Sequence, residues 1–214
     1  MSCHKSIPAI ALIGGIGSGK SAVANKVKSF RPVKVIDADQ IGHEVLEFPA
    51  VQQKIREHFG NAVFNAQDKI ERSQLAKIVF GEEKKHQDSL RKLEVLVHPE
   101  IHHRLEQEIL SAKATEEFDA ILIDAAVILE AGWEDLCDQI VFIQCPLEQR
   151  LKRVIQNRGW SSAELEKREK KQLPLSKKQA LANHTIHNDQ KLEAAAKEFS
   201  SFIETLLSQQ KTDN

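Results

Sequence analysis

The feature that most constrains the fold of this chain is a glycine-rich segment at residues 14–21, Gly-Gly-Ile-Gly-Ser-Gly-Lys-Ser. It matches the phosphate-binding pattern G-x-x-x-x-G-K-[ST] at every fixed position. Glycine lacks a β-carbon, so the backbone can curl until successive N–H groups point at phosphate oxygens. The residues expected to bind a nucleoside triphosphate in this way are Gly15, Gly17, Ser18, Gly19, Lys20 and Ser21.

The flanking residues supply the context that this pattern requires. Residues 8–13 are a continuous apolar run of the kind found in buried parallel strands, and residues 21–27 have helical spacing of their apolar side chains. Lys20 can then reach the β- and γ-phosphates, the Ser21 hydroxyl can ligate Mg²⁺, and the helix adds the positive end of its dipole. A turn that binds nothing is the weaker alternative. A dinucleotide site fits poorly, because it would need glycine at Lys20.

Composition narrows the class of protein. The chain has 214 residues, enough for one domain with small insertions, and 30 basic against 31 acidic residues. This balance favours neither nucleic acid nor an anionic membrane as a partner. Cys3, Cys137 and Cys145 lack metal or disulfide spacing, and no segment has the length and apolarity of a membrane span or signal peptide. We expect a cytoplasmic protein.

Strand-like and helical segments alternate along the chain. Further strands are predicted at residues 33–36, 120–123 and 139–143, with a weaker one at 185–186. Helical patterns separate them, which is typical of an α/β fold with a five-stranded parallel sheet and helices on both faces. Another helix is predicted at residues 40–46.

Two stretches interrupt this alternation, and insertions at the carboxyl edge of such a sheet commonly bind the second substrate or form a lid. Residues 51–114 are mostly helical, with helix starts near Glu71-Arg72 and Glu82-Glu83, and Pro99 is expected to kink or restart the longest helix. Residues 158–178 form a charged helical hairpin, which we call the lid. We therefore expect a single domain, 1–214, with a core at about 1–50, 115–157 and 179–214.

Phosphoryl transfer also requires a group that orients the attacking hydroxyl. Asp37 and Asp39 follow a predicted strand, at the sheet edge where the glycine-rich segment also begins, and in an extended segment both side chains would point to the same side. We favour Asp39 for this role. The alternative is a helix N-cap, because Asp39 directly precedes the helix predicted at 40–46.

Cations that neutralise the transferred group are expected on the helix after the fourth strand. Arg150 and Arg153 lie three residues apart on one face, and Arg158 and Arg168 follow. The basic run at 167–171 is better explained as a solvated face. Asp124 ends a predicted strand in the manner of an acidic residue that steadies Mg²⁺, although this signal is weak. His98, His102 and His103 share a helix segment, but structural roles are favoured over metal binding.

The chain resembles the dephospho-coenzyme A kinase family over nearly its whole length. The glycine-rich segment by itself indicates only a broad superfamily, whereas the ordered set of segments is far more specific. Besides residues 14–21, the segments that carry the resemblance are Val35-Ile36-Asp37-Ala38-Asp39, His43-Glu44-Val45, Phe59-Gly60, Ile70-Glu71-Arg72, Leu75, Val79-Phe80, Val97-His98-Pro99, Leu129-Glu130, the arginines of the lid, Gln172, Lys178 and Ile186-His187-Asn188.

The resemblance implies ATP-dependent phosphorylation of the ribose 3′-hydroxyl of dephospho-coenzyme A, with Mg²⁺, as the last step of coenzyme A synthesis. It implies catalytic roles for Asp39, Lys20 and Arg153. ATP binding would extend to Ala22, Arg150, Arg158 and Asn188. The acceptor would be bound by His98, Val127 and Glu130 together with Asp39.

Three positions depart from the family pattern. Ile13 stands where threonine is frequent, Ala22 replaces a frequent Ser or Thr, and the segment from Asp124 to Glu130 lacks a usual proline. With Ala131-Gly132-Trp133, this last segment is more similar to the kinase half of animal bifunctional coenzyme A synthase.

Three rival functions remain on the residues alone. The nearest is a nucleoside or nucleotide kinase of the same fold. A GTP-dependent switch would need an N-K-x-D signature, but Asn25-Lys26 is followed by Val27-Lys28. A nucleotide-binding scaffold without catalysis is disfavoured because Lys20, Ser21, Asp39 and Arg153 are all present.

Overall fold

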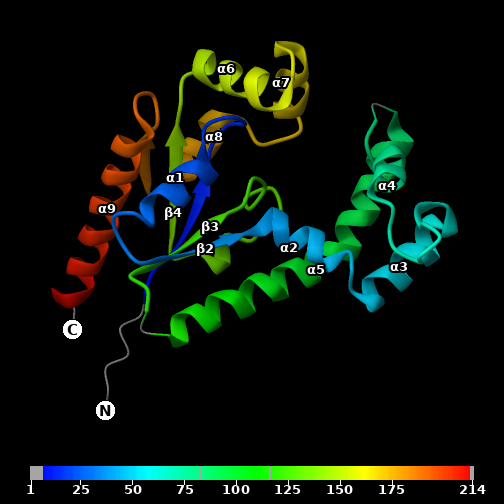
Figure 1. The fold of residues 1–214 in the computed structure, drawn as a ribbon, viewed down its shortest axis with the longest axis horizontal. Helices are drawn as coiled ribbons and strands as arrows, with labels where there is room; N and C mark the ends of the chain where they lie inside the picture. Colours follow the sequence, from blue (N-terminus) through cyan, green and yellow to red (C-terminus); the bar gives the residue numbers. More distant parts are fainter. Residues whose placement is uncertain (1–6, 82, 116, 213–214) are drawn as a thin grey trace. The chain divides into compact units, whose positions relative to one another are not determined.

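A parallel five-stranded sheet organises the computed structural model, which describes residues 7–81, 83–115 and 117–212. The strands are β1 (Ala9–Ile13), β2 (Val33–Asp37), β3 (Ala120–Asp124), β4 (Gln139–Gln144) and β5 (His184–His187), in the spatial order β2-β3-β1-β4-β5 (Figure 1). The predicted α/β fold with a five-stranded parallel sheet is confirmed, and each predicted strand overlaps an observed one.

The chain divides into two compact units, Met1–Asp37 with Gln107–Asn214 and Ala38–Glu106. The larger unit holds the sheet. Its helices are α1 (Lys20–Val27), α6 (Leu147–Arg158), α7 (Ser162–Glu169), α8 (Leu175–Leu181) and α9 (Leu192–Thr212), with a 3₁₀ turn, η2, at Glu134–Leu136.

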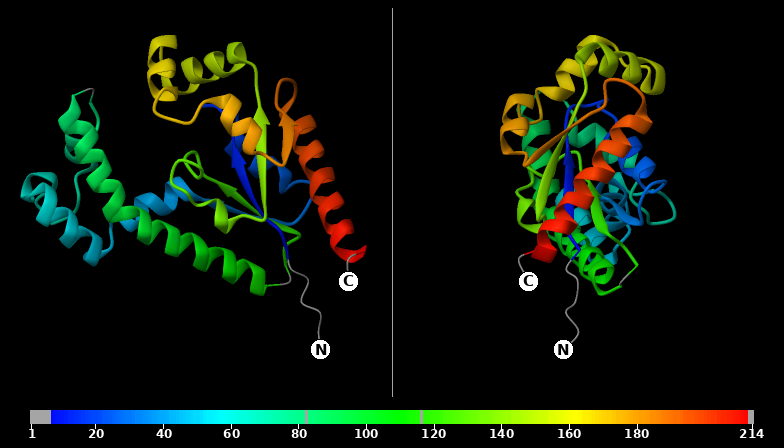
Figure 2. Two further views of the ribbon diagram at one scale, coloured as in Figure 1. Left: turned by 180° about the vertical axis from the view of Figure 1, so that it is seen from behind. Right: turned by 90° about the vertical axis from the view of Figure 1, so that its left-hand side faces the viewer.

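One face of the sheet packs against α1 and α9. Alternate residues of the strands, such as Ile10 and Leu12 of β1, are fully buried against Val23 of α1 and Phe199 of α9. Alternation follows from the two-residue period of a strand. In both views of Figure 2, α9 lies beside β5, which it contacts.

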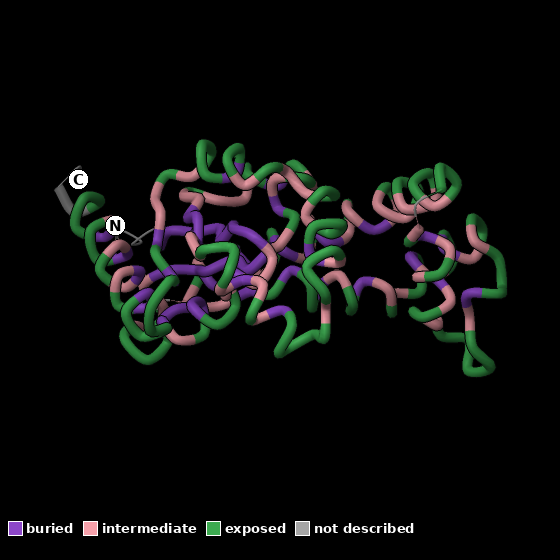
Figure 3. The backbone as a smooth tube through the Cα atoms, turned by 90° about the horizontal axis from the view of Figure 1, so that it is seen from above, coloured by how far each residue is buried: buried purple, intermediate pink, exposed green. Residues whose placement is uncertain are grey.

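The opposite face of the sheet is buried as well. Every residue of β1 and β3 is buried, and Figure 3 shows the strands in the colour of buried residues. Strands buried on both faces are continuous apolar runs rather than alternating ones, which explains why these segments could be recognised in the sequence. This rigid layer carries the loops that follow each strand.

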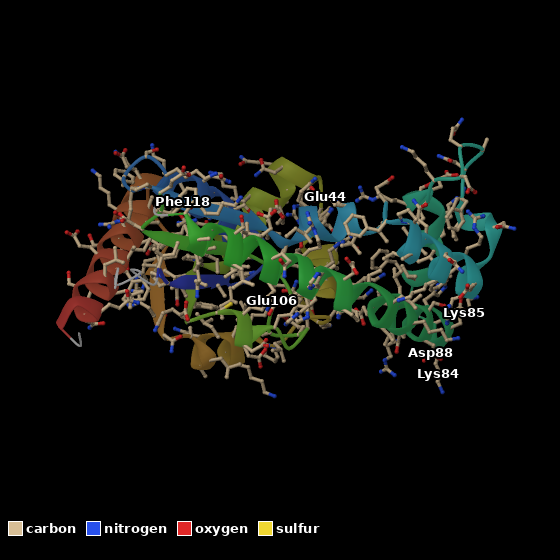
Figure 4. All side chains as sticks on the ribbon, turned by 90° about the horizontal axis from the view of Figure 1, so that it is seen from below. Glu44, Lys84, Lys85, Asp88, Glu106 and Phe118 are labelled. Atoms are coloured by element: carbon tan, nitrogen blue, oxygen red, sulfur yellow. The ribbon has the colours of Figure 1, made fainter. Side chains whose placement is uncertain are left out.

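The smaller unit is helical. It contains α2 (Ala38–Val45), α3 (Pro49–Phe59), the 3₁₀ turn η1 (Asn61–Val63), α4 (Arg72–Val79) and most of α5 (Lys84–Ala114). The buried residues Val51, Ile55, Val63 and Leu75 form its interior. Exposed charged residues such as Lys84, Lys85 and Asp88 project from the first turns of α5 (Figure 4).

Two local predictions need correction. Of the two outcomes predicted at Pro99, a kink or a restart, the restart does not occur, because α5 continues from Lys84 to Ala114. The helix accommodates the ring by forgoing one hydrogen bond, since proline has no N–H to donate to the Val95 carbonyl. Asp39 does not lie in an extended segment: α2 begins at Ala38, so Asp39 lies in its first helical turn.

Other helix starts can be checked against the structure. Helix α4 begins at Arg72 with Glu71 before it, as predicted. Helix α5 begins at Lys84, and the predicted start at Glu82 lies outside the described residues, as does Cys3. Within the part of the chain that the structure describes, no helix combines the length and apolarity needed to cross a membrane.

Candidate active site

The glycine-rich segment forms the turn between β1 and α1. Gly14, Gly17 and Gly19 have φ angles of 149°, 79° and 88°, which residues with a β-carbon rarely adopt. A β-carbon on Gly14 would lie 2.7 Å from the Ile143 carbonyl oxygen, and one on Gly17 would lie 2.8 Å from that of Arg150. The turn is therefore closely packed against β4 and α6.

Helix α1 begins at Lys20, directly after Gly19. The N–H groups of the first turn of a helix lack intrahelical acceptors, so the start of α1 offers donors and a positive dipole end to an anion. Lys20 Nζ donates a weak hydrogen bond of 3.4 Å to the Gly14 carbonyl, which folds its side chain back over the turn. Ser21 and Ala22 are exposed at the same helix end.

A pocket of about 400 Å³ opens over this turn. It brings together most of the residues predicted to bind the nucleotide, although they lie far apart in the sequence. Its lining residues are Gly17, Gly19, Lys20, Ser21, Ala22, Arg153, Val154, Asn157, Arg158, Asn188 and Leu192.

Arg153 connects three segments beside the pocket. Its Nη1 donates to the Ser18 carbonyl at 3.0 Å and lies 3.3 Å from Cys145 Sγ, while its Nη2 donates to the Asn188 carbonyl at 3.2 Å. These contacts hold the guanidinium beside the glycine-rich turn. Because the guanidinium is already held in place, it can stabilise the negative charge of a bound phosphate without first being ordered.

Asn188 forms the other wall of the pocket. It follows β5, and its Nδ2 donates a 2.7 Å hydrogen bond to the Ser18 carbonyl. The residue is 2% exposed, and its Oδ1 has no hydrogen-bond partner among the described residues. A buried amide oxygen without a donor is costly, so this atom is available to accept a hydrogen bond from a ligand or water.

Arg150 occupies a different environment from Arg153. It is buried, it donates to the Ile16 carbonyl at 3.3 Å, and its Nη1 pairs with Glu169 at the end of α7. It does not line the pocket, and neither do Gly15 and Ser18. In this structure Arg150 therefore links the turn to the lid.

Sequence reasoning missed several residues around the pocket. Trp160 lies between Arg158 and Arg168, with their guanidinium carbons 4.8 and 4.1 Å from its ring. Cation–π contacts of this kind order arginine side chains. Asn157 lies four residues after Arg153, so the same helix-face argument could have identified it. For Trp160 the sequence has no comparable signal.

Oxygen ligands suited to Mg²⁺ occur at the ends of two elements. The Ser21 hydroxyl is in the pocket lining. Asp124 ends β3 and is the register partner of Leu12 in β1, two residues before the turn begins. A hydroxyl and a carboxylate are hard ligands, and Mg²⁺ commonly uses one or two of them together with substrate phosphates. No cluster of three or more His, Cys, Asp or Glu residues suited to a metal occurs among residues 7–81, 83–115 and 117–212.

The predicted acceptor residues fall into two groups. Asp39, which is exposed on α2, and His98, which is half-buried on α5, belong to the smaller unit. Val127 and Glu130 belong to the larger unit, on the segment of residues 125–133 that follows β3, which we call the β3 loop. Glu130 Oε1 accepts hydrogen bonds from Lys178 Nζ at 2.9 Å and from the Leu173 N–H at 2.8 Å.

Burial changes the pKa of two groups in these regions. It lowers the pKa of His98 below the usual value, because the charged imidazolium is desolvated, although Glu94 partly opposes this effect. Burial also raises the pKa of the Cys145 thiol, against the opposing charges of Arg153 and Arg150. His98 is thus favoured in its neutral form, and Cys145 as a thiol.

Comparisons with known proteins identify the family. The family model described as dephospho-CoA kinase matches residues 8–194. A dephospho-CoA kinase of Rhodopirellula baltica is 34% identical over 184 residues, which cover 86% of this chain and 84% of the relative.

Solved structures have a similar fold. The crystal structure of TT1252 from Thermus thermophilus has a TM-score of 0.77 at 29% identity and covers 94% of this chain and 99% of that one. A dephospho-CoA kinase from Campylobacter jejuni has a TM-score of 0.62 and covers 94% of this chain and 97% of its own, but at 22% identity it supports only the fold. Because the family model matches residues 8–194 and the relative from Rhodopirellula baltica is 34% identical over 84% of its length, the chain belongs to the dephospho-CoA kinase family, whose reaction is the final step of coenzyme A biosynthesis.

Proposed function

We propose that this chain transfers the γ-phosphoryl group of ATP to the ribose 3′-hydroxyl of dephospho-coenzyme A, giving coenzyme A and ADP. The observation that supports this most strongly is the pocket over the glycine-rich turn, where Lys20, Ser21, Arg153 and Asn188 converge in a member of this family. The substrates would be these two small molecules in the cytoplasm, with no role for nucleic acid or membrane. Net charge of −1 and the free thiols of Cys137 and Cys145 are consistent with that assignment.

The donor half of the reaction uses electrostatic stabilisation. Backbone N–H groups of residues 15–21 would hold the β-phosphate, and Lys20 would reach the β- and γ-phosphates. Arg153 and Arg158 would offset charge on the transferred group, with Arg153 as the catalytic cation because its contacts already fix it beside the turn. We also assign Gly15, Ser18 and Arg150 to ATP binding, as parts of this cradle, and Asn188 to the nucleotide side.

Mg²⁺ fits the oxygen ligands at this site. Ser21 would hold it, with Asp124 steadying it from the end of β3. When bound, Mg²⁺ would offset negative charge on the phosphates during transfer. The protein's own part is to present the Ser21 hydroxyl at the start of α1, where the backbone N–H groups also point.

The acceptor half requires a residue that orients the 3′-hydroxyl and takes its proton, and we assign this role to Asp39. Its exposed carboxylate in the first turn of α2 is chemically suited to accept a proton. His98, Val127 and Glu130 would bind the rest of the acceptor. The neutral state of His98 would allow it to donate one hydrogen bond and accept another.

We further propose that the chain works as a single kinase domain, 1–214, with an acceptor-side insertion at about 51–114 and a lid at about 158–178. The lid carries Arg158 and contacts the turn through the Glu169–Arg150 ion pair. Its closure over the pocket would exclude water and limit ATP hydrolysis.

An acceptor panel tests the proposed function. The purified protein is incubated with Mg²⁺ and radiolabelled ATP, together with dephospho-coenzyme A, nucleosides or nucleotides in separate reactions. Labelled coenzyme A should form, and its position of labelling should be the 3′-hydroxyl. Transfer to nucleosides without transfer to dephospho-coenzyme A would instead support the nucleoside kinase alternative, and GTP as the better donor would correct the nucleotide assignment.

A further inference from the structure

Lys178, at 1% exposure, is among the largest fully buried side chains of the described residues and carries a charge. It lies on α8, at the end of the lid. Burying an ammonium group is costly unless all of its donors are satisfied and a counter-charge is present. A lysine at such a position therefore has either a structural or a functional reason.

The surroundings of Lys178 satisfy its three donors. Nζ forms an ion pair with Glu130 Oε1 at 2.9 Å and donates to Gln172 Oε1 at 3.0 Å and to the Ala126 carbonyl at 3.4 Å. Glu130 Oε1 also accepts the Leu173 N–H at 2.8 Å. We call this network of Lys178, Gln172 and Glu130 the clasp.

The clasp joins two segments that lie about fifty residues apart in the sequence. Ala126 and Glu130 belong to the β3 loop, whereas Gln172 and Leu173 lie between α7 and α8. Burial of Ile128 and Trp133 fixes the inner side of the loop, at 1% and 5% exposure. The clasp holds the backbone at Ala126, immediately before the exposed Val127.

The same stretch also contacts the donor side. Glu169, three residues before Gln172, pairs with Arg150, which in turn donates to the Ile16 carbonyl in the glycine-rich turn. Residues 169–178 therefore connect the turn that holds ATP to the β3 loop. Two loops of one site are joined by partly buried, charge-assisted hydrogen bonds, which are stronger than neutral ones.

We propose that Lys178 is a positioning residue for acceptor binding, acting through Glu130 and Gln172 to hold the β3 loop in register with the lid. The proposal rests on the proposed function, because it takes Val127 and its neighbours to bind dephospho-coenzyme A. Lys178 itself touches no substrate: its effect is exerted on the loop backbone. A misplacement of about 1 Å in a positioning element can cost about 10²-fold in rate.

The test compares Lys178→Met with wild type in steady-state kinetics, varying ATP and dephospho-coenzyme A separately. Methionine has similar length and no charge, so it removes the clasp and little else. We expect KM for dephospho-coenzyme A to rise by about tenfold or more, with KM for ATP changed by less than about threefold. Lys170→Met is the matched control, because Lys170 is exposed and its Nζ pairs with Glu166 Oε1, four residues earlier, at 2.8 Å.

A double-mutant cycle with Glu130→Gln separates the clasp from a direct contact. If Glu130 acts through Lys178, its substitution should cost much less in the Lys178→Met background than in wild type. The proposal would be overturned if the losses caused by the two single substitutions multiplied in the double variant. It would also be overturned if KM for ATP and KM for dephospho-coenzyme A rose equally. Circular dichroism and thermal unfolding check that Lys178→Met folds. If it does not fold, the milder variant Gln172→Leu replaces it, and the same comparison of KM for dephospho-coenzyme A with KM for ATP is made.

Different results would contradict the proposed function and the role of the clasp. Wild-type protein without activity on dephospho-coenzyme A would contradict the proposed function. Active wild type with an unchanged KM for dephospho-coenzyme A in both folded variants would contradict only the clasp.

Discussion

At the scale of single residues, the same residue type takes different roles according to burial and partners. Arg150 and Arg153 lie three residues apart on α6, yet only Arg153 lines the pocket, whereas Arg150 is buried against Ile16 and Glu169. The helical spacing predicted that both arginines lie on one face. It could not distinguish their roles, because the residues that contact each arginine come from distant segments of the sequence. The assignment of each arginine to ATP stays a prediction.

Asp39 is the residue on which the proposed chemistry most depends. Replacement by asparagine removes the proton acceptor and preserves size, so turnover should fall by about 10²- to 10⁴-fold, the usual contribution of a general base. KM for ATP should change little, because the donor is held by other residues. Steady-state kinetics measure both, and Glu44→Gln, exposed on the same helix, is the control. Near-normal turnover of Asp39→Asn would remove Asp39 from catalysis.

The two described thiols should differ from free cysteine in reactivity. Burial, followed by the nearby Asp138, Asp135 and Glu134, raises the pKa of Cys137 to about 12. The thiolate is the reactive form, so in native protein at pH 9 we expect iodoacetamide to label Cys137 about 10²- to 10³-fold more slowly than in urea. Peptide mass spectrometry reads each site separately. Equal rates in both conditions would show that Cys137 is accessible and ionised.

The same shift has a consequence for stability. The native state keeps the Cys137 proton that the unfolded state loses near pH 9, so the native state binds more protons above that pH. The free energy of unfolding should therefore decline as pH rises from about 9 towards 12, and by less in a Cys137→Ala variant. Urea unfolding across this range, compared between the two proteins, measures the difference.

At the scale of elements, local sequence determined most boundaries. The strands were recognisable because they are apolar runs that end at Asp37, Asp124 or Cys145-Pro146, and α4 because Glu71 precedes it. The restart predicted at Pro99 does not occur, because a single missing hydrogen bond did not end α5. The low helix propensity of proline is a local cost. In this helix of 31 residues, packing of the buried side chains of Val97, Ile101 and Leu105 stabilises the helix by more than that cost.

Helix α7 provides a prediction at this scale. Ser161 is its N-cap, and its hydroxyl accepts the Glu164 N–H at 3.2 Å. Ser161→Ala should destabilise α7 by about 1 kcal/mol, the usual value of an N-cap. Hydrogen exchange should therefore accelerate in α7 while the strands are unaffected. Ser162→Ala, one residue inside the helix, is the control; equal acceleration in both variants would indicate that the cap bond is not important.

At the scale of the whole molecule, the candidate nucleotide site is made by tertiary contacts of the larger unit. Gly19, Arg153 and Asn188 lie on the segments that follow β1, β4 and β5, and these segments begin at one edge of the sheet because the strands are parallel. Asn188 Oδ1, buried without a donor, is the clearest sign within the described residues of a ligand partner.

Ligand binding should stabilise this assembly. At about 100 times its dissociation constant, Mg²⁺ with a non-hydrolysable ATP analogue should add about 2.7 kcal/mol to the free energy of unfolding. For a chain of this size that corresponds to roughly 5–10 °C in Tm. Lys20→Met should reduce the shift sharply, whereas Lys152→Met, exposed and outside the pocket lining, should not. An identical shift in Lys20→Met would contradict the role of Lys20 in holding the phosphates.

The sequence by itself determined the class of fold, the glycine-rich cradle and the family, because these depend on local patterns: apolar runs, residues that permit positive φ, and an ordered set of motifs. Only the tertiary structure decided which side chains meet. It separated Arg153 from Arg150, placed Trp160 between two arginines, and buried Lys178 against Glu130 and Gln172. The physical reason is that burial and pairing of charges depend on residues distant in sequence, for which a local pattern carries no information.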